Sequence, residues 1–142
     1  MNCTLLEAKS DEDIRRCYAV MRELRPHVTE AEFLPRIRRQ MAQGYRLIFA
    51  ETNGDVTAAA GFRFFDMLAW GKAMYVDDLI SDERYRGGGF ASKLIDSMIA
   101  LARKNGCDQF HLDSAVHRHV AHRFYLHKGM DITSHHFAMK LK

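Results

Sequence analysis

The segment RYRGGGFA, residues 84–91, places two arginines and three consecutive glycines between an apolar run and a helical pattern. Glycine takes positive φ angles at no steric cost and has no side chain to block a ligand, so the backbone N–H groups of such a turn can converge on a phosphate. The first turn of the following helix adds a positive dipole, and the arginines add charge. The segment therefore predicts a phosphate-binding turn. Its candidate binding residues are Arg84, Arg86, Gly87, Gly88, Gly89, Phe90 and Ala91.

Outward from this turn, the chain predicts a helix on one side and a strand on the other. Apolar residues after it recur at three- and four-residue spacing from Leu94 to Ala102, and the pattern stops at Asn105-Gly106, a common helix end. Before it, residues 73–80 are largely apolar, as expected of a buried strand. A helix that begins directly after a glycine-rich turn is a typical setting for phosphate binding.

The spacing separates this turn from the common nucleotide-binding motifs. A P-loop has a Lys-Ser/Thr pair after its last glycine, whereas Phe90-Ala91 follow here. A dinucleotide fingerprint spaces its glycines G-x-G-x-x-G, and this spacing is not met. The spacing that fits is R-x-x-G-x-G, formed by Arg84, Gly87 and Gly89. It resembles the turn with which the GNAT superfamily of N-acetyltransferases binds the pyrophosphate of acetyl-CoA.

A second segment, residues 121–130, carries the other half of the resemblance. Its sequence AHRFYLHKGM is similar to the A-x-x-F-Y-x-x-x-G-F segment of the same superfamily. From the residues alone, Phe124 and Leu126 predict an apolar helix stripe, and Gly129 is a typical residue just past a helix end. In the family this helix lies along the cofactor, and its tyrosine commonly points at the coenzyme sulfur. The resemblance implies that Tyr125 donates a hydrogen bond or a proton to the leaving thiolate, although a Phe-Tyr pair also suits a plain core position.

Two adjacent carboxylates, Asp77 and Asp78, interrupt the apolar strand at 73–80. Burying an unpaired charge is costly, and alternation sends neighbouring side chains to opposite faces of a sheet unless a bulge intervenes. One interpretation pairs one aspartate with an arginine and leaves the other at a wet strand end; another has one of them accept a proton from a substrate amine. The run is similar to the Glu-Asp-aromatic run of diamine-type acetyltransferases, which implies Asp77 as the base. Asp78, or a histidine near the pocket such as His111 or His117, stays open as the alternative.

The resemblance also implies the reaction partners. Acetyl-CoA would be the acetyl donor, with its pantetheine arm on backbone groups near Leu79 and Ile80. Arg118, at a position where many relatives carry asparagine, would reach the cofactor or pair with Asp113. The acceptor would be the primary amine of a small molecule, which attacks the thioester directly without a metal or a covalent enzyme intermediate. Two alternatives stay open: a catalytically silent acyl-CoA-binding module, and an acetyltransferase acting on lysine side chains or N-terminal amines of proteins.

By its length the chain predicts a single domain, residues 1–142, in which strands and helices alternate. Asn53-Gly54 is a strong hairpin signal. An alternating pattern from Ile132 to Leu141 predicts a last strand, through which a homodimer is also expected. The order matches the GNAT acetyltransferase fold, an α/β fold whose mixed, mostly antiparallel sheet has helices on both faces. The expected elements are strands at 4–8, 45–51, 56–65, 73–80, 109–113 and 132–141, and helices after Ser10, after Thr29, at 90–104 and around Tyr125.

Composition limits the other function classes. The net charge of +3 is too small to indicate a nucleic-acid partner. The sequence contains no run of about 18 apolar residues, so no membrane span is expected. The N-terminus becomes charged too soon for a signal peptide. Three cysteines without a C-x-x-C pair indicate free thiols in a reducing compartment, so the cytoplasm is expected. Among the eight histidines, His122 and His127 have a spacing found in zinc sites, but the partner pair of ligands is absent, so no metal is expected.

Overall fold

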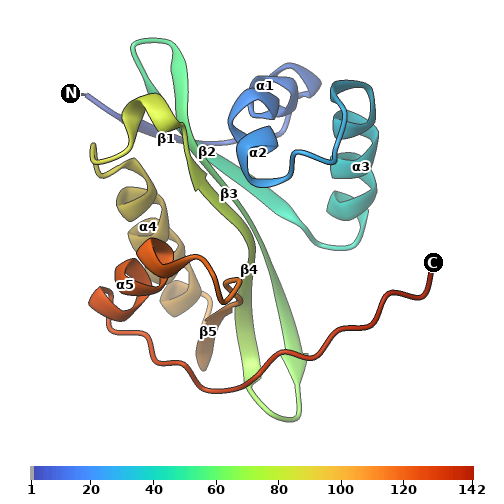
Figure 1. Ribbon diagram of the computed structural model, residues 1–142, viewed down its shortest axis with the longest axis vertical. Helices are drawn as coiled ribbons and strands as arrows, with labels where there is room; N and C mark the ends of the chain where they lie inside the picture. The colour runs from blue at the N-terminus through green and yellow to red at the C-terminus, as the bar shows by residue number, and fades with distance from the viewer. Residues whose placement is uncertain (1) are drawn as a thin grey trace. The chain divides into compact units, whose positions relative to one another are not determined.

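The structure is a computed structural model that describes residues 2–142 (Figure 1). The chain forms two compact units, the first ending at His111 and the second running Leu112–Lys142. In chain order the elements are β1 (Thr4–Glu7), α1 (Asp11–Arg16), α2 (Tyr18–Leu24), α3 (Glu30–Ala42), β2 (Arg46–Thr52), β3 (Asp55–Met67), β4 (Gly71–Ser81), the 3₁₀ turn η1 (Glu83–Tyr85), α4 (Phe90–Lys104), β5 (Gln109–Leu112) and α5 (His119–His127).

The strands form one sheet in the order β1-β2-β3-β4-β5, in which the pairs β1–β2, β2–β3 and β3–β4 are antiparallel. The β2–β3 hairpin turns at Asn53 and Gly54, whose φ angles of 53° and 81° are those of the tight turn that the sequence predicts. β5 follows β4 through helix α4, the kind of crossover that joins parallel strands. The predicted α/β fold with a mixed, mostly antiparallel sheet is confirmed.

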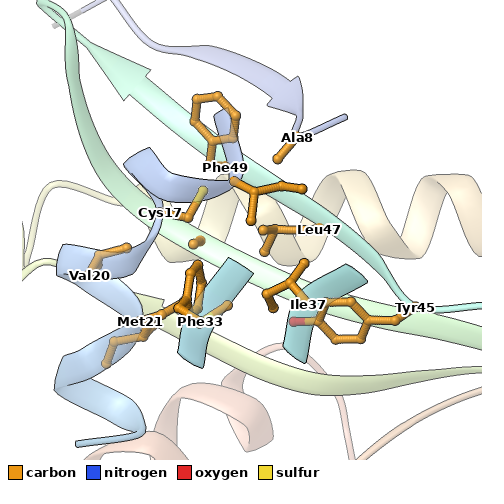
Figure 2. Packing of buried hydrophobic residues seen from close by; sticks show 12 residues of the cluster. Ala8, Cys17, Val20, Met21, Phe33, Ile37, Tyr45, Leu47 and Phe49 are labelled. Carbon is orange, nitrogen blue, oxygen red and sulfur yellow. The ribbon is translucent and has the colours of Figure 1, made fainter. Parts of the chain in front are cut away.

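Helices cover both faces of the sheet (Figure 1). Helices α1 to α3 pack on one face, over the buried cluster that Figure 2 shows. Helix α4 packs against β2, β3 and β4 with Leu94, Ile95 and Met98 fully buried. Burying one such side chain contributes about 1.5–3 kcal/mol to folding, so these two layers fix where β4 lies. The labelled cluster residues in Figure 2 are Ala8, Cys17, Val20, Met21, Phe33, Ile37, Tyr45, Leu47 and Phe49.

The helix starts follow the predicted capping residues. The Ser10 hydroxyl accepts from the Asp13 amide, and Thr29 forms a capping box with Glu32. The helix predicted after Ser10 is interrupted, because the Cys17 amide bonds back three residues to Ile14 O (3.1 Å) and divides it into α1 and α2. Within residues 2–142, none of the helices combines the length and the apolar character that crossing a bilayer requires.

A bulge in β4 changes the register that alternation predicts. Gly61 of β3 lies opposite Asp78, whereas the next residue of β3, Phe62, lies opposite Val76. Asp77 is therefore an extra residue on β4, with no direct partner on β3. Such a residue breaks the strict alternation of faces, so two adjacent carboxylates can serve one side of the sheet.

The predicted strand from Ile132 to Leu141 is wrong. Residues 131–142 form no strand, and the apolar side chains of this segment are exposed. An alternating pattern supplies only a preference for extended backbone, and a strand also needs a neighbour with which to form a ladder. The homodimer was expected to form through this strand, so the described structure does not support that expectation.

Candidate functional site

The glycine turn, residues 84–91, has the backbone geometry that its sequence predicts. Gly87 and Gly89 have φ angles of 89° and 81°, a region that costs other residues about 1–2 kcal/mol. Gly88 is required for a different reason: an added Cβ would lie 2.8 Å from the Phe90 ring and 3.0 Å from Tyr85 O. The turn therefore needs all three of its glycines, two for conformation and one for space.

The amides at the start of α4 lack partners within the helix. The first N–H groups of any α-helix have no intrahelical acceptor, and Gly89, the N-cap residue, has no side chain with which to cap them. The Gly88 amide already donates to Tyr85 O (3.0 Å). The amides of Phe90 and Ala91 are among those without an intrahelical acceptor, and they lie at the positive end of a 15-residue helix, suited to bind an anion.

The two arginines of the turn are bound to carboxylates. Arg84 donates from Nη2 to Asp82 Oδ2 (2.7 Å), and Arg86 donates from Nη2 to Glu23 Oε1 (3.1 Å). The Arg84 guanidinium lowers the pKa of Asp82, and the carboxylate raises the pKa of Arg84 in return. Both guanidinium groups stay largely exposed, with 67% and 52% of their side-chain surface accessible, so they can also face an anion outside the turn.

The backbone of Leu79 and Ile80 lies beyond the reach of β5. β5 has four residues and begins next to Asp108, whose amide donates to Lys72 O (2.7 Å) on β4. Leu79 lies seven residues after Lys72 on β4, whereas β5 has only four residues, so β5 does not extend as far as Leu79. The edge of β4 that faces β5 is therefore not paired with β5 at Leu79 and Ile80, as the predicted pantetheine-binding role requires.

A pocket of about 370 Å³, the β4 pocket, lies between β4 and the helices on its face, all within the first unit. This volume is within the range typical of small-molecule sites. Apolar side chains of the core form part of its wall, and arginines, a histidine and two aspartates supply the polar part. The lining residues are Tyr18, Met21, Arg22, Arg25, His27, Val28, Phe33, Arg36, Ile37, Gln40, Tyr45, Tyr75, Asp77 and Asp78.

Both aspartates line the β4 pocket, and each is bound to an arginine. Arg63 donates to Asp77 in bidentate geometry, from Nε to Oδ1 (3.0 Å) and from Nη2 to Oδ2 (2.6 Å). Arg25 donates from Nε to Asp78 Oδ1 (2.9 Å) and from Nη2 to the Asp77 carbonyl oxygen (2.9 Å). The expectation that only one aspartate pairs with an arginine is wrong, because the bulge at Asp77 brings both carboxylates within reach of guanidinium groups.

Tyr45 connects Asp78 to the core. Its hydroxyl donates to Asp78 Oδ2 (2.8 Å), and the Tyr45 side chain is 2% exposed. Burial, and then the neighbouring Asp78 charge, raise the pKa of Tyr45 well above its usual value, so the hydroxyl stays a donor. The ring crosses β3 at Gly61, where an added Cβ would lie 1.7 Å from Tyr45 Oη. Gly61 is thus the condition for the Tyr45–Asp78 hydrogen bond.

Of the two histidines proposed as alternative bases, His111 lies outside the β4 pocket, and His117 belongs to the second unit. His111 stacks on Trp70 with ring centroids 3.4 Å apart, and it does not line the β4 pocket. His27 does line it, although sequence reasoning did not single it out. Among residues 2–142, no cluster of three or more His, Cys, Asp or Glu side chains is arranged to bind a metal.

Two predicted residues, Tyr125 and Arg118, belong to the second unit. Tyr125 lies on α5, where its ring meets that of Phe124 edge to face at 5.4 Å. Arg118 is the N-cap residue of the same helix. Burial raises the pKa of Tyr125 while the nearby Arg118 charge opposes the shift, so the phenol is protonated at neutral pH, as a proton donor must be.

Sequence reasoning missed most of the β4 pocket. Arg22, Arg25 and Arg36 lie on helices and in a loop whose sequence carries no motif. One signal was present: Gly61 is an isolated glycine in a strand, which often marks the close approach of another group. It points to crowding but does not identify Tyr45 as the neighbour.

Comparison with known proteins identifies the family of this chain. The chain matches the model of the acetyltransferase (GNAT) family over residues 11–130, a range that runs through both units. It is 29% identical over 130 residues to an uncharacterized N-acetyltransferase, YhdJ, of Bacillus subtilis (strain 168), which covers 90% of this chain and 92% of that protein. A stretch of 63 residues is 32% identical to the thialysine N-epsilon-acetyltransferase of Mus musculus and covers 44% of this chain and 37% of that protein.

Solved structures share the fold at low sequence identity. The structure of AAC(6')-Iy in complex with the bisubstrate analog CoA-S-monomethyl-acetylneamine has a TM-score of 0.84 at 13% identity and covers 100% of this chain and 99% of its own. Glucosamine-6-phosphate N-acetyltransferase from Arabidopsis thaliana has a TM-score of 0.79 at 21% identity and covers 100% of both chains. From the family match and these relatives, the chain belongs to the GNAT family of acetyltransferases, which use acetyl-CoA, and it is an acyltransferase.

Proposed function

We propose that this acetyltransferase transfers the acetyl group of acetyl-CoA directly to the primary amine of a small molecule. The observation that carries the proposal is the β4 pocket, which has the volume of a small-molecule site and two carboxylates in its wall. A carboxylate attracts an ammonium group and can accept its proton. An acceptor that enters this pocket is a small molecule or a single side chain, rather than an extended protein surface.

The relatives support an amine of low molecular weight. One is named for thialysine, and the AAC(6')-Iy structure contains an analogue built from CoA and acetylneamine. These names describe those proteins, whose acceptors differ from one another. They support the class of the acceptor and leave its identity to the pocket of this chain.

The glycine turn is proposed to bind the donor. The amides of Phe90 and Ala91 and the positive φ angles of Gly87 and Gly89 fit a pyrophosphate, with Arg84 or Arg86 near it. The backbone of Leu79 and Ile80 is proposed to bind the pantetheine arm, and Arg118 to lie along the cofactor. When bound, acetyl-CoA supplies an activated acetyl thioester.

Residues of this chain would then accept and donate the protons that the reaction transfers. Asp77 is proposed to accept a proton from the substrate ammonium, directly or through water, because only the neutral amine is a nucleophile. Bidentate binding by Arg63 fixes the orientation of this carboxylate. As the new C–N bond forms and the C–S bond breaks, Tyr125 donates a hydrogen bond or proton to the sulfur. Backbone N–H groups polarise the carbonyl, and much of the acceleration comes from positioning the reactants.

Thermal melting with acetyl-CoA, CoA and ATP tests the donor side first. At about 100 times its dissociation constant a ligand adds about 2.7 kcal/mol of stability, which raises the melting temperature by about 5–10 °C. We expect a shift with acetyl-CoA and CoA and none with ATP. No shift with either coenzyme would overturn the proposed role of the glycine turn.

A thiol-release assay with a panel of amines then tests the chemistry. Asp77→Asn is expected to lower kcat by about 100-fold or more while the melting shift with CoA stays, because the general base is lost and the donor site is intact. Asp78→Asn is the matched comparison on the neighbouring residue. A larger loss in kcat for the Asp78 variant would move the role of the base to Asp78, and an unchanged kcat in both would remove it from the pair.

A further inference from the structure

The charges of the β4 pocket do not balance, and this imbalance bears on the acceptor. Three arginines, Arg22, Arg25 and Arg36, line the pocket, against two aspartates. Arg25 is bound to Asp78, and Asp77 is bound to Arg63, which lies outside the lining. The carboxylates are thus each matched by a guanidinium before any substrate enters.

The guanidinium groups of Arg22 and Arg36 take no part in these two ion pairs. In the part of the chain that the structure describes, neither guanidinium has a carboxylate within ion-pair distance. The Glu32 carboxylate, one helical turn before Arg36, accepts from the Thr29 amide in the capping box (3.2 Å), and it does not line the pocket. The Thr29 hydrogen bonds and, to a smaller extent, the Arg36 charge lower the pKa of Glu32. Arg22 and Arg36 come from α2 and α3, so two separate elements bring cations to one cavity.

We infer that the amine acceptor also carries an anionic oxygen group, a carboxylate or a phosphate, which Arg22 and Arg36 bind while the amine lies at Asp77 and Asp78. The inference rests on the proposed function, because it describes the same pocket. Arginine presents a planar fork of donors that matches carboxylate and phosphate geometry, and such charge-assisted bonds are the strong ones. A purely cationic amine would meet two guanidinium groups in the pocket that no carboxylate binds.

The acceptor class can be tested by binding, separately from turnover. The protein is saturated with CoA, so that the glycine turn is filled, and the melting temperature is measured with O-phosphoethanolamine, β-alanine, ethanolamine and β-alaninamide. The first two probes carry an amine and an anion; the last two are their counterparts without the anion. We expect a further rise with at least one anionic amine and none with the two counterparts that lack the anion, and the larger rise tells phosphate from carboxylate.

Variants then locate the anion site. Arg22→Gln and Arg36→Gln are each expected to weaken binding of the anionic amine about 10-fold or more, because a charge-assisted hydrogen bond is lost. Arg39→Gln is the matched control, since Arg39 lies on α3, one turn from Arg36, and does not line the pocket. It is expected to bind like the unaltered protein, and all variants are expected to keep the shift with CoA.

Two outcomes would overturn the inference. One is that no anionic amine raises the melting temperature beyond the shift with CoA. The other is that Arg22→Gln and Arg36→Gln bind the anionic amine as well as Arg39→Gln does. In both cases the CoA shift and thiol release with neutral or cationic amines would leave the proposed function standing, whereas absence of the CoA shift itself counts against that function.

Discussion

The glycine turn and the β4 pocket are built from different parts of the protein. The turn, residues 84–91, is one continuous segment, and what it offers a ligand is backbone: two glycines at positive φ and the first amides of α4. The pocket draws side chains from α2, the loop after it, α3, Tyr45 just before β2, and β4, and what it offers is charge. A backbone site tolerates changes of side chain around it, whereas a side-chain site depends on every contact that positions its charges.

Substitution of Gly61 is expected to have the largest effect, and it falls on the β4 pocket alone. In Gly61→Ala the new Cβ would take the place of the Tyr45 hydroxyl, 1.7 Å away, so the buried ring must move and release Asp78. Overpacking and the loss of a hydrogen bond to a charged group together cost about 3 kcal/mol. Chemical denaturation measures this loss, and amine turnover should fall with it.

A double-mutant cycle of Gly61→Ala with Tyr45→Ala tests whether Gly61 provides the space for the Tyr45 ring. With the ring removed, Gly61→Ala should cost little more, because the clash has gone. Equal costs of Gly61→Ala with and without Tyr45 would contradict the role of Gly61 as the space for that ring. The shift in melting temperature with CoA should persist in every member of the cycle that folds.

The core beneath the β4 pocket contains ionisable groups, so alkaline pH is expected to have the next largest effect on the free energy of unfolding. Burial raises the pKa of Cys17 from 9.0 to about 12. Between these values the unfolded chain has lost the thiol proton and the folded chain keeps it, so the folded state binds more protons and the free energy of unfolding falls as pH rises. The slope is about 1.4 kcal/mol per pH unit, or about 2 kcal/mol by pH 10.5.

Urea unfolding at pH 7.5, 9.5 and 10.5 measures this slope. Cys17→Ala should be less stable at pH 7.5, because it leaves a small cavity, and should lose less between pH 7.5 and 10.5. Cys3→Ala is the control, since Cys3 is only partly buried near the N-terminus. Parallel curves for the unaltered protein and Cys17→Ala would show that the thiol does not contribute.

On the side of the glycine turn, two glycines with the same φ of 81° separate strain from binding. Gly89 lies in the turn and Gly54 in the β2–β3 hairpin, and an added Cβ at either meets no atom within 4 Å. Gly89→Ala and Gly54→Ala should therefore lose similar stability, about 1 kcal/mol. Only Gly89→Ala is expected to weaken CoA binding, about 10-fold, as measured by calorimetry. Equal CoA affinity in the two variants would exclude Gly89 from the donor site.

The same contrast explains what could be predicted from the sequence. The glycine turn is contiguous, and its backbone geometry follows from the conformational preference of glycine and the position of a helix start, so Gly87, Gly88 and Gly89 could be proposed as a binding turn from the sequence. Asp77 and Asp78 were recognisable as charges out of place in an apolar strand. Their partners were not, because Arg63 and Arg25 reach them only after a bulge and three helices have been arranged. The last strand failed for the same reason: Ile132 to Leu141 has the pattern but lacks a ladder partner in the described structure.

Two arginine–aspartate pairs extend the comparison to the smallest expected effect. Both pairs are bidentate, but Arg63 and Asp77 are each 21% exposed, whereas the side chain of Arg84 is 67% exposed. Lysine keeps the charge at either position and loses the planar fork.

In Arg63→Lys the Asp77 carboxylate should lose its fixed orientation, and kcat/KM for the amine should fall about fivefold with KM for acetyl-CoA unchanged. In Arg84→Lys, KM for acetyl-CoA should change by less than about threefold, because an exposed pair is screened by solvent. A greater loss of amine turnover in Arg84→Lys than in Arg63→Lys would mean that the turn, rather than the pocket, positions the acceptor, and the distinction between a backbone site and a side-chain site would fail.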